Sequence, residues 1–144
     1  MKYTIEINQP IEKVYALFTD RDNLKKWQSK LLNYQHLHGE KGEVGSVSEL
    51  TYKGLTVFET ITSKVYPTEV ISEYEHKRNA VTKMYHTAIN KFSKLESGKT
   101  LYEMTIEQKV VGFLPQIVMT IMAGTVKKYH KKLLKDFKKF AEKQ

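Results

Sequence analysis

The first residues of the chain alternate between apolar and polar side chains over positions 2–7, the period of a half-buried strand. Apolar residues then recur at helical spacing from Ile11 to Phe18, so we expect a short amphipathic helix directly after Pro10. Asp20 is suited to cap a second short helix that ends near Trp27. The pattern therefore predicts one strand followed by two short helices.

Strand signals fill the middle of the chain. Runs rich in Val, Ile, Thr, Tyr and Phe, separated by short turns, predict strands over 31–38, 46–53, 56–65, 69–76, 81–94 and 100–111. Turns this short make neighbouring strands antiparallel, because a parallel crossover needs about a dozen residues or more. A seven-stranded antiparallel sheet is too long to stay flat, and we expect it to curl.

A long helix is predicted from Pro115 to about Glu142. In its second half the apolar residues form a single stripe: Val126, Tyr129, Leu133, Phe137 and Phe140. In its first half they cover most of the circumference: Ile117, Val118, Met119, Ile121, Met122 and Ala123. Such a helix must be covered on more than one side, by the concave sheet and by a ligand, a second chain or the protein's own loops. The predicted fold is α+β, in one domain spanning 1–144.

Composition narrows the class of protein. The 144 residues contain no cysteine, which excludes disulfides, thiolate metal sites and a cysteine nucleophile. No secretory signal is evident at the start, and the longest apolar stretch, 113–126, is too short and too broken to span a bilayer. We therefore expect a cytoplasmic protein with no membrane span.

The net charge of +8 is concentrated at the end of the chain. Residues 127–144 hold eight lysines against Asp136 and Glu142, a balance of +6, which leaves +2 for the rest. Arg21 and Arg78 are the only arginines beside 22 lysines, which argues against specific nucleic-acid recognition. A solvated helix face explains this excess; non-specific binding to RNA, ribosomes or anionic lipid is the alternative.

The order of elements and several short motifs resemble the START-related SRPBCC superfamily, whose helix-grip fold is shared by the birch-pollen-allergen group. The matching residues are Ile5-Glu6-Ile7-x-x-Pro10-x-x-x-Val14-Tyr15, Phe18-Thr19-Asp20, Asn23-Leu24-x-x-Trp27, Gly39-x-x-Gly42-x-x-Gly45-Ser46, Glu59-Thr60-Ile61, Gly98-x-Thr100 and Gly112. A Lys-rich final helix completes the match. The chain looks closest to the bacterial branch of polyketide cyclase/dehydrase and lipid-transport-like proteins.

This resemblance implies a curved seven-stranded antiparallel sheet wrapped around the C-terminal helix, with a hydrophobic cavity between them. The expected function is binding of a small hydrophobic ligand that is aromatic, polyketide-like or lipid-like. One alternative is a cyclase or dehydratase that uses acid and base groups of the pocket. The second alternative is a module that associates with RNA, ribosomes or chaperones through its Lys-rich helix.

Among the acidic residues, Glu59 is the candidate for a role in the cavity. It shares a strand face with Val57 and Ile61, and the resemblance implies that the glutamate of this E-x-I pattern points into the cavity. A carboxylate there needs a partner, or its pKa rises. It would anchor a ligand, serve as a general acid or base together with His86, or belong to an internal network with tyrosines or a lysine. If it is isolated, Glu59→Gln should leave stability little changed.

The remaining candidates are aromatic and apolar residues on the elements that would enclose the cavity. The full expected ligand-binding set is Trp27, Tyr52, Glu59, Ile61, Tyr74, Tyr102, Met104, Val118 and Met122. No cofactor or metal is expected, since His36 and His38 lack an evident third ligand. His130 is expected to be solvated among lysines. A weak homodimer is expected to cover the apolar residues around Ile117.

Overall fold

The computed structural model describes the backbone of residues 1–77, 82–112 and 116–144; the side chains of Thr82, Gln116, Val118, Met119 and Met122 lie outside the description. The predicted order of elements is confirmed. In sequence they are β1 (Lys2–Ile7), α1 (Ile11–Thr19), the 3-10 turn η1 (Arg21–Asn23), α2 (Leu24–Trp27), β2 (Leu31–His38), β3 (Val47–Tyr52), β4 (Leu55–Val65), β5 (Glu69–His76), β6 (Thr82–Lys94), β7 (Thr100–Gly112) and α3 (Gln116–Glu142).

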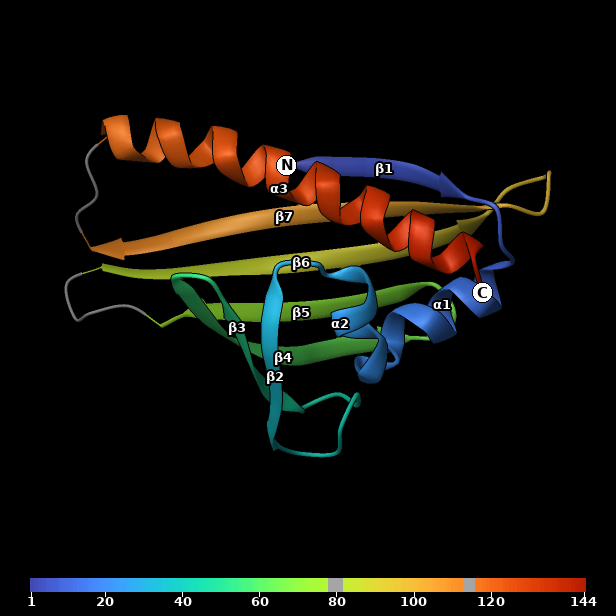
Figure 1. Cartoon of the computed structure of the whole chain (residues 1–144), viewed down its shortest axis with the longest axis horizontal. Helices are drawn as coiled ribbons and strands as arrows, with labels where there is room; N and C mark the ends of the chain where they lie inside the picture. Colours follow the sequence, from blue (N-terminus) through green and yellow to red (C-terminus); the bar gives the residue numbers. More distant parts are fainter. Residues whose placement is uncertain (78–81, 113–115) are drawn as a thin grey trace.

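The strands form one antiparallel sheet of seven in the order β1-β7-β6-β5-β4-β3-β2. Only β1 lies out of sequence, because it pairs with the last strand, β7. Shifts of register interrupt the pairing of β2 with β3 and of β4 with β5. Such irregularities bend strands, and in Figure 1 β2 runs across the direction of β6 and β7. The expected curl of the sheet is therefore present.

Glycines shape the loop between β2 and β3 and bring it close to Arg21. Gly39 has φ of 76°, and a Cβ atom there would lie 3.0 Å from the backbone oxygen of Gly45. Both the positive φ and the close backbone contact require glycine at this position. A Cβ on Gly42 would lie 3.7 Å from Cγ of Arg21. The loop therefore packs close to the aliphatic part of the Arg21 side chain.

The two halves of α3 have different surroundings. In the second half Leu134, Phe137 and Ala141 are buried, and the helix packs against β1 and α2. Figure 1 shows its C-terminal end beside α1, where Lys13 Nζ donates to the backbone oxygen of Gln144 at 2.5 Å. In the first half Ile117 is 71% exposed and Ile121 is 66% exposed. In the sequence, apolar residues surround most of this half of the helix. In the structure, the side that carries Ile117 and Ile121 is uncovered.

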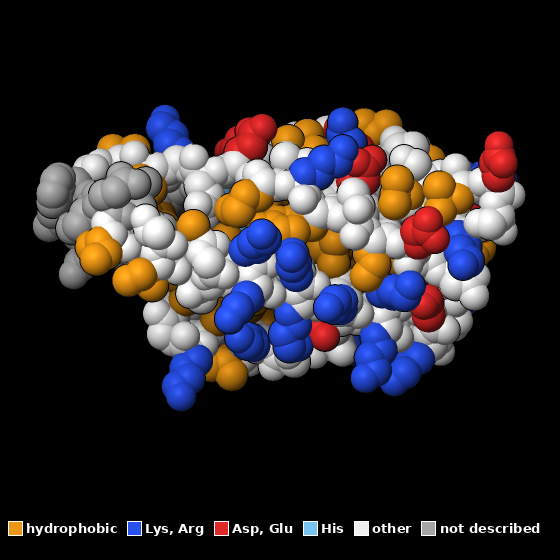
Figure 2. Space-filling model, turned by 90° about the horizontal axis from the view of Figure 1, so that it is seen from above, with side chains coloured by type: hydrophobic (Ala, Val, Ile, Leu, Met, Phe, Trp, Pro, Cys, Tyr) orange, Lys and Arg blue, Asp and Glu red, His pale blue; other side chains and the backbone are white. Residues whose placement is uncertain are grey.

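Lysines cover the outer side of α3. Figure 2 shows Lys and Arg side chains gathered over the middle of the face seen from above. The exposed lysines that α3 contributes are Lys127, Lys128, Lys131, Lys132, Lys135 and Lys139, and the exposed Lys143 follows its last residue. Across the part of the chain that the structure describes, no helix is both long enough and apolar enough to cross a membrane.

Candidate functional site: a cavity between the sheet and the C-terminal helix

A small internal cavity of about 60 Å³ lies between the concave face of the sheet, the short helices and α3. Aromatic and aliphatic side chains form most of its wall: Phe18, Leu24, Trp27, Tyr52, Tyr74, Ala88, Tyr102, Met104, Ile106, Tyr129 and Leu133. The polar members of the wall are Arg21, Gln28, Glu59, Asn90 and His130. The cavity thus combines an apolar surface with a few polar groups, as ligand sites do.

A buried ion pair stands in the wall of this cavity. Arg21 and Glu59 have side chains only 5% and 3% exposed, and Nη2 of Arg21 donates to Oε1 of Glu59. The hydroxyl of Tyr74 donates to the second oxygen, Oε2, at 2.5 Å. Glu59 and Tyr74 face each other across the β4–β5 pair, whereas Arg21 reaches them from the turn that Asp20 caps. Both carboxylate oxygens of Glu59 therefore have donors.

The pKa directions at this ion pair follow from burial and charge. Burial is the largest single effect and by itself would lower the pKa of the Arg21 guanidinium. The charge and hydrogen bond of Glu59, together with the tyrosines Tyr74 and Tyr34, outweigh burial and raise that pKa above its ordinary value. Burial, followed by the charge of Glu59, raises the pKa of Tyr74 well above its ordinary value. At neutral pH Arg21 is therefore charged, and Tyr74 keeps the proton that it donates to Glu59.

Two more tyrosines of the wall have side-chain partners. The hydroxyl of Tyr102 donates to Oδ1 of Asn90 at 2.8 Å, and that of Tyr52 donates to Oε1 of Gln28 at 2.6 Å. Burial raises the pKa of Tyr52 and of Tyr102. Both hydroxyls therefore remain protonated donors. Their partners, Asn90 and Gln28, use their amide oxygens to accept these bonds.

Three histidines lie in or beside the cavity wall. His86 stacks on Tyr74 with ring centroids 4.5 Å apart, and its Nδ1 is 2.9 Å from Nε2 of His76. His130 on α3 is only 6% exposed and stacks on Tyr3, so the expectation that it is solvated is wrong. Burial lowers the pKa of His86 to about 3 and that of His130 to about 4. Both are neutral at physiological pH.

The sequence-based set of ligand-binding residues divides into three groups. Six of its members line the cavity: Trp27, Tyr52, Glu59, Tyr74, Tyr102 and Met104. Ile61 is buried on the same face of β4, as predicted, but does not border the cavity. Val118 and Met122 lie outside the residues whose side chains are described. His86, the second acid–base candidate, touches Tyr74 without being part of the cavity wall.

Sequence reasoning missed Arg21, Asn90 and His130. Arg21 lies in a three-residue turn with no periodicity, and its burial depends on Glu59, which is 38 positions away. Asn90 lies on the inward face of β6 with Ala88 and Phe92, so strand alternation could have located it. In the described part of the chain, no three His, Asp or Glu side chains lie close enough together to hold a metal ion.

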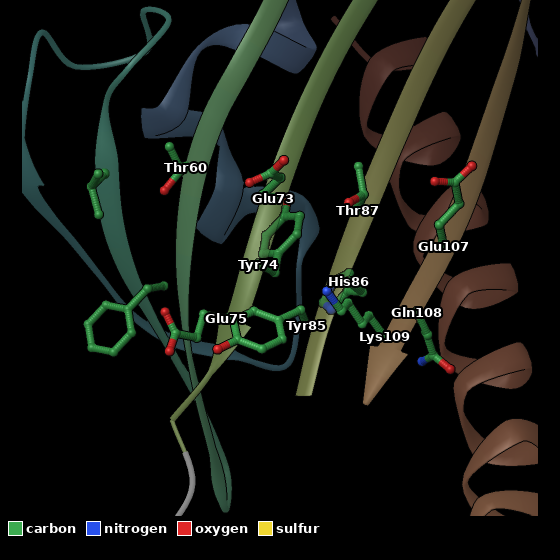
Figure 3. Close-up of a pocket in the computed structure, with 12 residues that line it drawn as sticks. Thr60, Glu73, Tyr74, Glu75, Tyr85, His86, Thr87, Glu107, Gln108 and Lys109 are labelled. Atoms are coloured by element: carbon green, nitrogen blue, oxygen red, sulfur yellow. The ribbon is translucent and has the colours of Figure 1, made fainter. Parts of the chain in front are cut away.

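A larger hollow of about 710 Å³ lies on the opposite, outer face of the sheet (Figure 3). Figure 3 shows Glu73 and Glu75 of β5, Tyr85 of β6 and Glu107 of β7 bordering it. The carboxylates are exposed, and none of the buried unpaired polar atoms of the described residues borders this hollow. Its volume suits a ligand better, but the buried polar groups converge on the inner cavity, which we therefore take as the candidate site.

The sequence profile of the family described as polyketide cyclase / dehydrase and lipid transport matches residues 1–142. The chain belongs to this family. It lies within the START-related SRPBCC superfamily, as the sequence resemblance predicted. No curated protein matches the chain in sequence.

Solved structures give the same fold at low sequence identity. The crystal structure of Ara h 8.0201 has a TM-score of 0.76 at 16% identity, covering 100% of this chain and 97% of that one. A conserved protein from Geobacillus kaustophilus has a TM-score of 0.77 at 16% identity, with 99% and 94% covered. A START superfamily protein from Mycobacterium smegmatis has a TM-score of 0.66 at 14% identity, with 93% and 92% covered. Identities this low establish the helix-grip fold and leave the ligand open.

Proposed function

We propose that this member of the family binds a small hydrophobic molecule, aromatic, polyketide-like or lipid-like, in the cavity between the sheet and α3. The observation that carries the proposal is the Arg21–Glu59 pair with Tyr74, buried in a wall that is mostly aromatic and aliphatic. Buried ion pairs contribute little to stability compared with apolar residues of similar size. Polar groups that converge on an apolar cavity are, however, what orients a ligand.

The cavity has to widen to hold such a molecule. Its 60 Å³ is far below the roughly 300–1,000 Å³ of ligand pockets. The second half of α3 is fixed by its packing on β1 and α2 and by hydrogen bonds to the segment after β1. The first half leaves Ile117 and Ile121 uncovered. The cavity wall receives Tyr129, His130 and Leu133 from α3, so an outward shift of the helix before Tyr129 is the movement that we propose for lengthening the cavity at that end.

Binding can be tested by adding bulk inside the cavity. Ala88 lines the cavity and is 5% exposed, so Ala88→Leu should fill part of the space. The matched control is Ala16→Leu on the exposed side of α1. A panel of fatty acids, flavonoids and naphthalene dyes is titrated by calorimetry and by the fluorescence of Trp27, the only tryptophan. Circular dichroism checks that both variants are folded.

We expect at least one compound class to bind the wild type and Ala16→Leu equally and to bind Ala88→Leu at least tenfold more weakly. Equal binding by all three proteins would place the ligand elsewhere, with the outer hollow as the first place to look. If no compound of the panel binds to the wild type, the proposed function is wrong.

A further inference from the structure

The unpaired buried polar groups of the cavity wall include two hydrogen-bond donors. Nε of Arg21 and Nε1 of Trp27 are both buried and have no hydrogen-bond partner. Both residues line the cavity, and they are 7% and 5% exposed. Each of these atoms carries an N–H and cannot accept a hydrogen bond. A buried donor without an acceptor costs free energy, and native structures contain few of them.

Each strong acceptor of the same wall already accepts a hydrogen bond. Glu59 accepts from Arg21 and Tyr74 through its two oxygens, and the amide oxygens of Asn90 and Gln28 accept from tyrosines. No carboxylate or amide oxygen is among the unpaired buried atoms of the described residues. One further ring nitrogen of the wall, Nδ1 of His130, is buried without a hydrogen-bond partner, and it can donate or accept according to its tautomer. The hydrogen-bonding groups of the wall that remain free for a ligand are therefore mainly donors.

The charge of the wall limits the ligand further. Arg21 and Glu59 compensate each other, and burial keeps His130 neutral at physiological pH. An ionised ligand would enter a low-dielectric space without a free counter-charge, which is unfavourable for a carboxylate and more so for an amine. A neutral oxygen that only accepts hydrogen bonds has neither disadvantage.

We propose that the cavity selects hydrophobic ligands that carry a neutral accepting oxygen, such as a ketone, ester or quinone carbonyl, which takes hydrogen bonds from Arg21 Nε–H and Trp27 Nε1–H. This inference rests on the proposed function and adds the chemical class of the ligand. Glu59 has a positioning role in it, because its carboxylate holds the guanidinium in place while Nε stays unpaired. Tyr74 in turn holds the carboxylate.

Three naphthalene probes of nearly equal shape test the proposal: 2-acetylnaphthalene, which has a carbonyl; 2-isopropenylnaphthalene, in which a CH₂ replaces the oxygen; and 1-(2-naphthyl)ethylamine, which is cationic at pH 7. Their dissociation constants are measured by calorimetry with the wild type. We expect the ketone to bind at least roughly tenfold more tightly than the hydrocarbon, because it accepts two hydrogen bonds that the hydrocarbon cannot accept, and we expect the amine to bind most weakly.

The single tryptophan provides a direct readout, because the folded protein gives only one indole N–H signal in a ¹H–¹⁵N spectrum. The ketone should move this proton signal downfield relative to the hydrocarbon complex. Trp27→Phe removes the N–H and keeps a ring, so the ketone-to-hydrocarbon affinity ratio should fall toward one. Using the ratio cancels the effect of the smaller ring on packing.

Two results would overturn the inference and leave the proposed function standing. One is equal binding of ketone and hydrocarbon by the wild type; the other is tightest binding of the amine. A Trp27→Phe variant that keeps the full ratio, together with an unmoved indole signal, would remove Trp27 from the proposal. If none of the probes binds and the wider panel fails as well, the proposed function itself is refuted.

Discussion

Replacing Glu59 by glutamine should strongly destabilise the protein. The change keeps the shape of the side chain and an oxygen that accepts from Tyr74, but it removes the charge that compensates Arg21. The Arg21 side chain is only 5% exposed, so the uncompensated guanidinium stays in a low-dielectric environment. Breaking a buried ion pair in this way costs about 3–5 kcal/mol. The total stability of a natural domain is about 5–15 kcal/mol, so the loss is a large share of it.

Urea unfolding, monitored by Trp27 fluorescence and by circular dichroism, measures this loss. The slope of the unfolding free energy against urea concentration should be the same in the variant and in the wild type. The matched control is Glu103→Gln, which breaks the surface pair with Lys2, where Nζ and Oε1 lie 2.5 Å apart. Exposed pairs contribute about 0–1 kcal/mol. The double variant Arg21→Met/Glu59→Gln removes both charges, so it should recover most of the stability that Glu59→Gln loses.

A loss below about 1 kcal/mol in Glu59→Gln would contradict the reasoning, because that is the range of exposed pairs. So would a double variant no more stable than Glu59→Gln, because the cost would then lie in packing. From the sequence alone, little change is expected if Glu59 serves a ligand as an isolated carboxylate, and a loss of stability is expected if Glu59 belongs to an internal network. The partners Arg21 and Tyr74 lead to the second expectation. The two expectations differ by several kcal/mol, and one denaturation series separates them.

Three further changes have defined outcomes. As the pH falls from 6.5 to about 4, the free energy of unfolding should fall by about 1.4 kcal/mol per pH unit for each of His86 and His130. Unfolded histidines take up protons in this range, whereas the folded ones, with pKa values of about 3 and about 4, do not. Urea titrations should show a shallower fall in His86→Asn/His130→Asn, and an equal fall in this variant and the wild type would refute the prediction. Tyr74→Phe should cost about 1.5–3 kcal/mol of unfolding free energy through the lost bond to Glu59, and a neutral result would show that the bond contributes nothing. Sedimentation should detect a weak homodimer that Ile117→Lys/Ile121→Lys dissolves, and a wild type that is monomeric at high concentration would exclude it.

The fold could be predicted because its signals are local. Alternation in the strands and short turns between them fix an antiparallel sheet, and the same alternation assigns Tyr52, Tyr74 and Tyr102 to the wall of the cavity. Ile61 shows the limit of this reasoning. It is buried on the inward face as predicted, but it adjoins a register shift of β4 and does not border the cavity. Alternation gives the face of the sheet and not the position along the cavity.

The partners inside the cavity could not be predicted in the same way. The burial of Arg21 is decided by tertiary contact with a residue of β4, and nothing adjacent to Arg21 in sequence indicates it. His130 was judged by its lysine neighbours, although helical spacing joins it to Val126, Leu134, Phe137 and Ala141 on the packed side of α3. A count along the helix face would have placed His130 correctly. For Arg21 no sequence signal exists.

The proposed binding of a ligand would explain the ion pair better than stability does. Apolar residues in place of Arg21 and Glu59 would leave the fold about as stable as it is, whereas either charge alone would weaken it. Stability therefore explains why neither charge occurs without the other. It does not explain why the protein has two charges at these positions in place of two apolar residues. Glu59 and Tyr74 hold the guanidinium in one position beside the cavity, and its Nε–H remains unpaired there. Arg21→Met/Glu59→Gln should accordingly stay folded and still bind the hydrocarbon naphthalene, while losing the preference for the ketone.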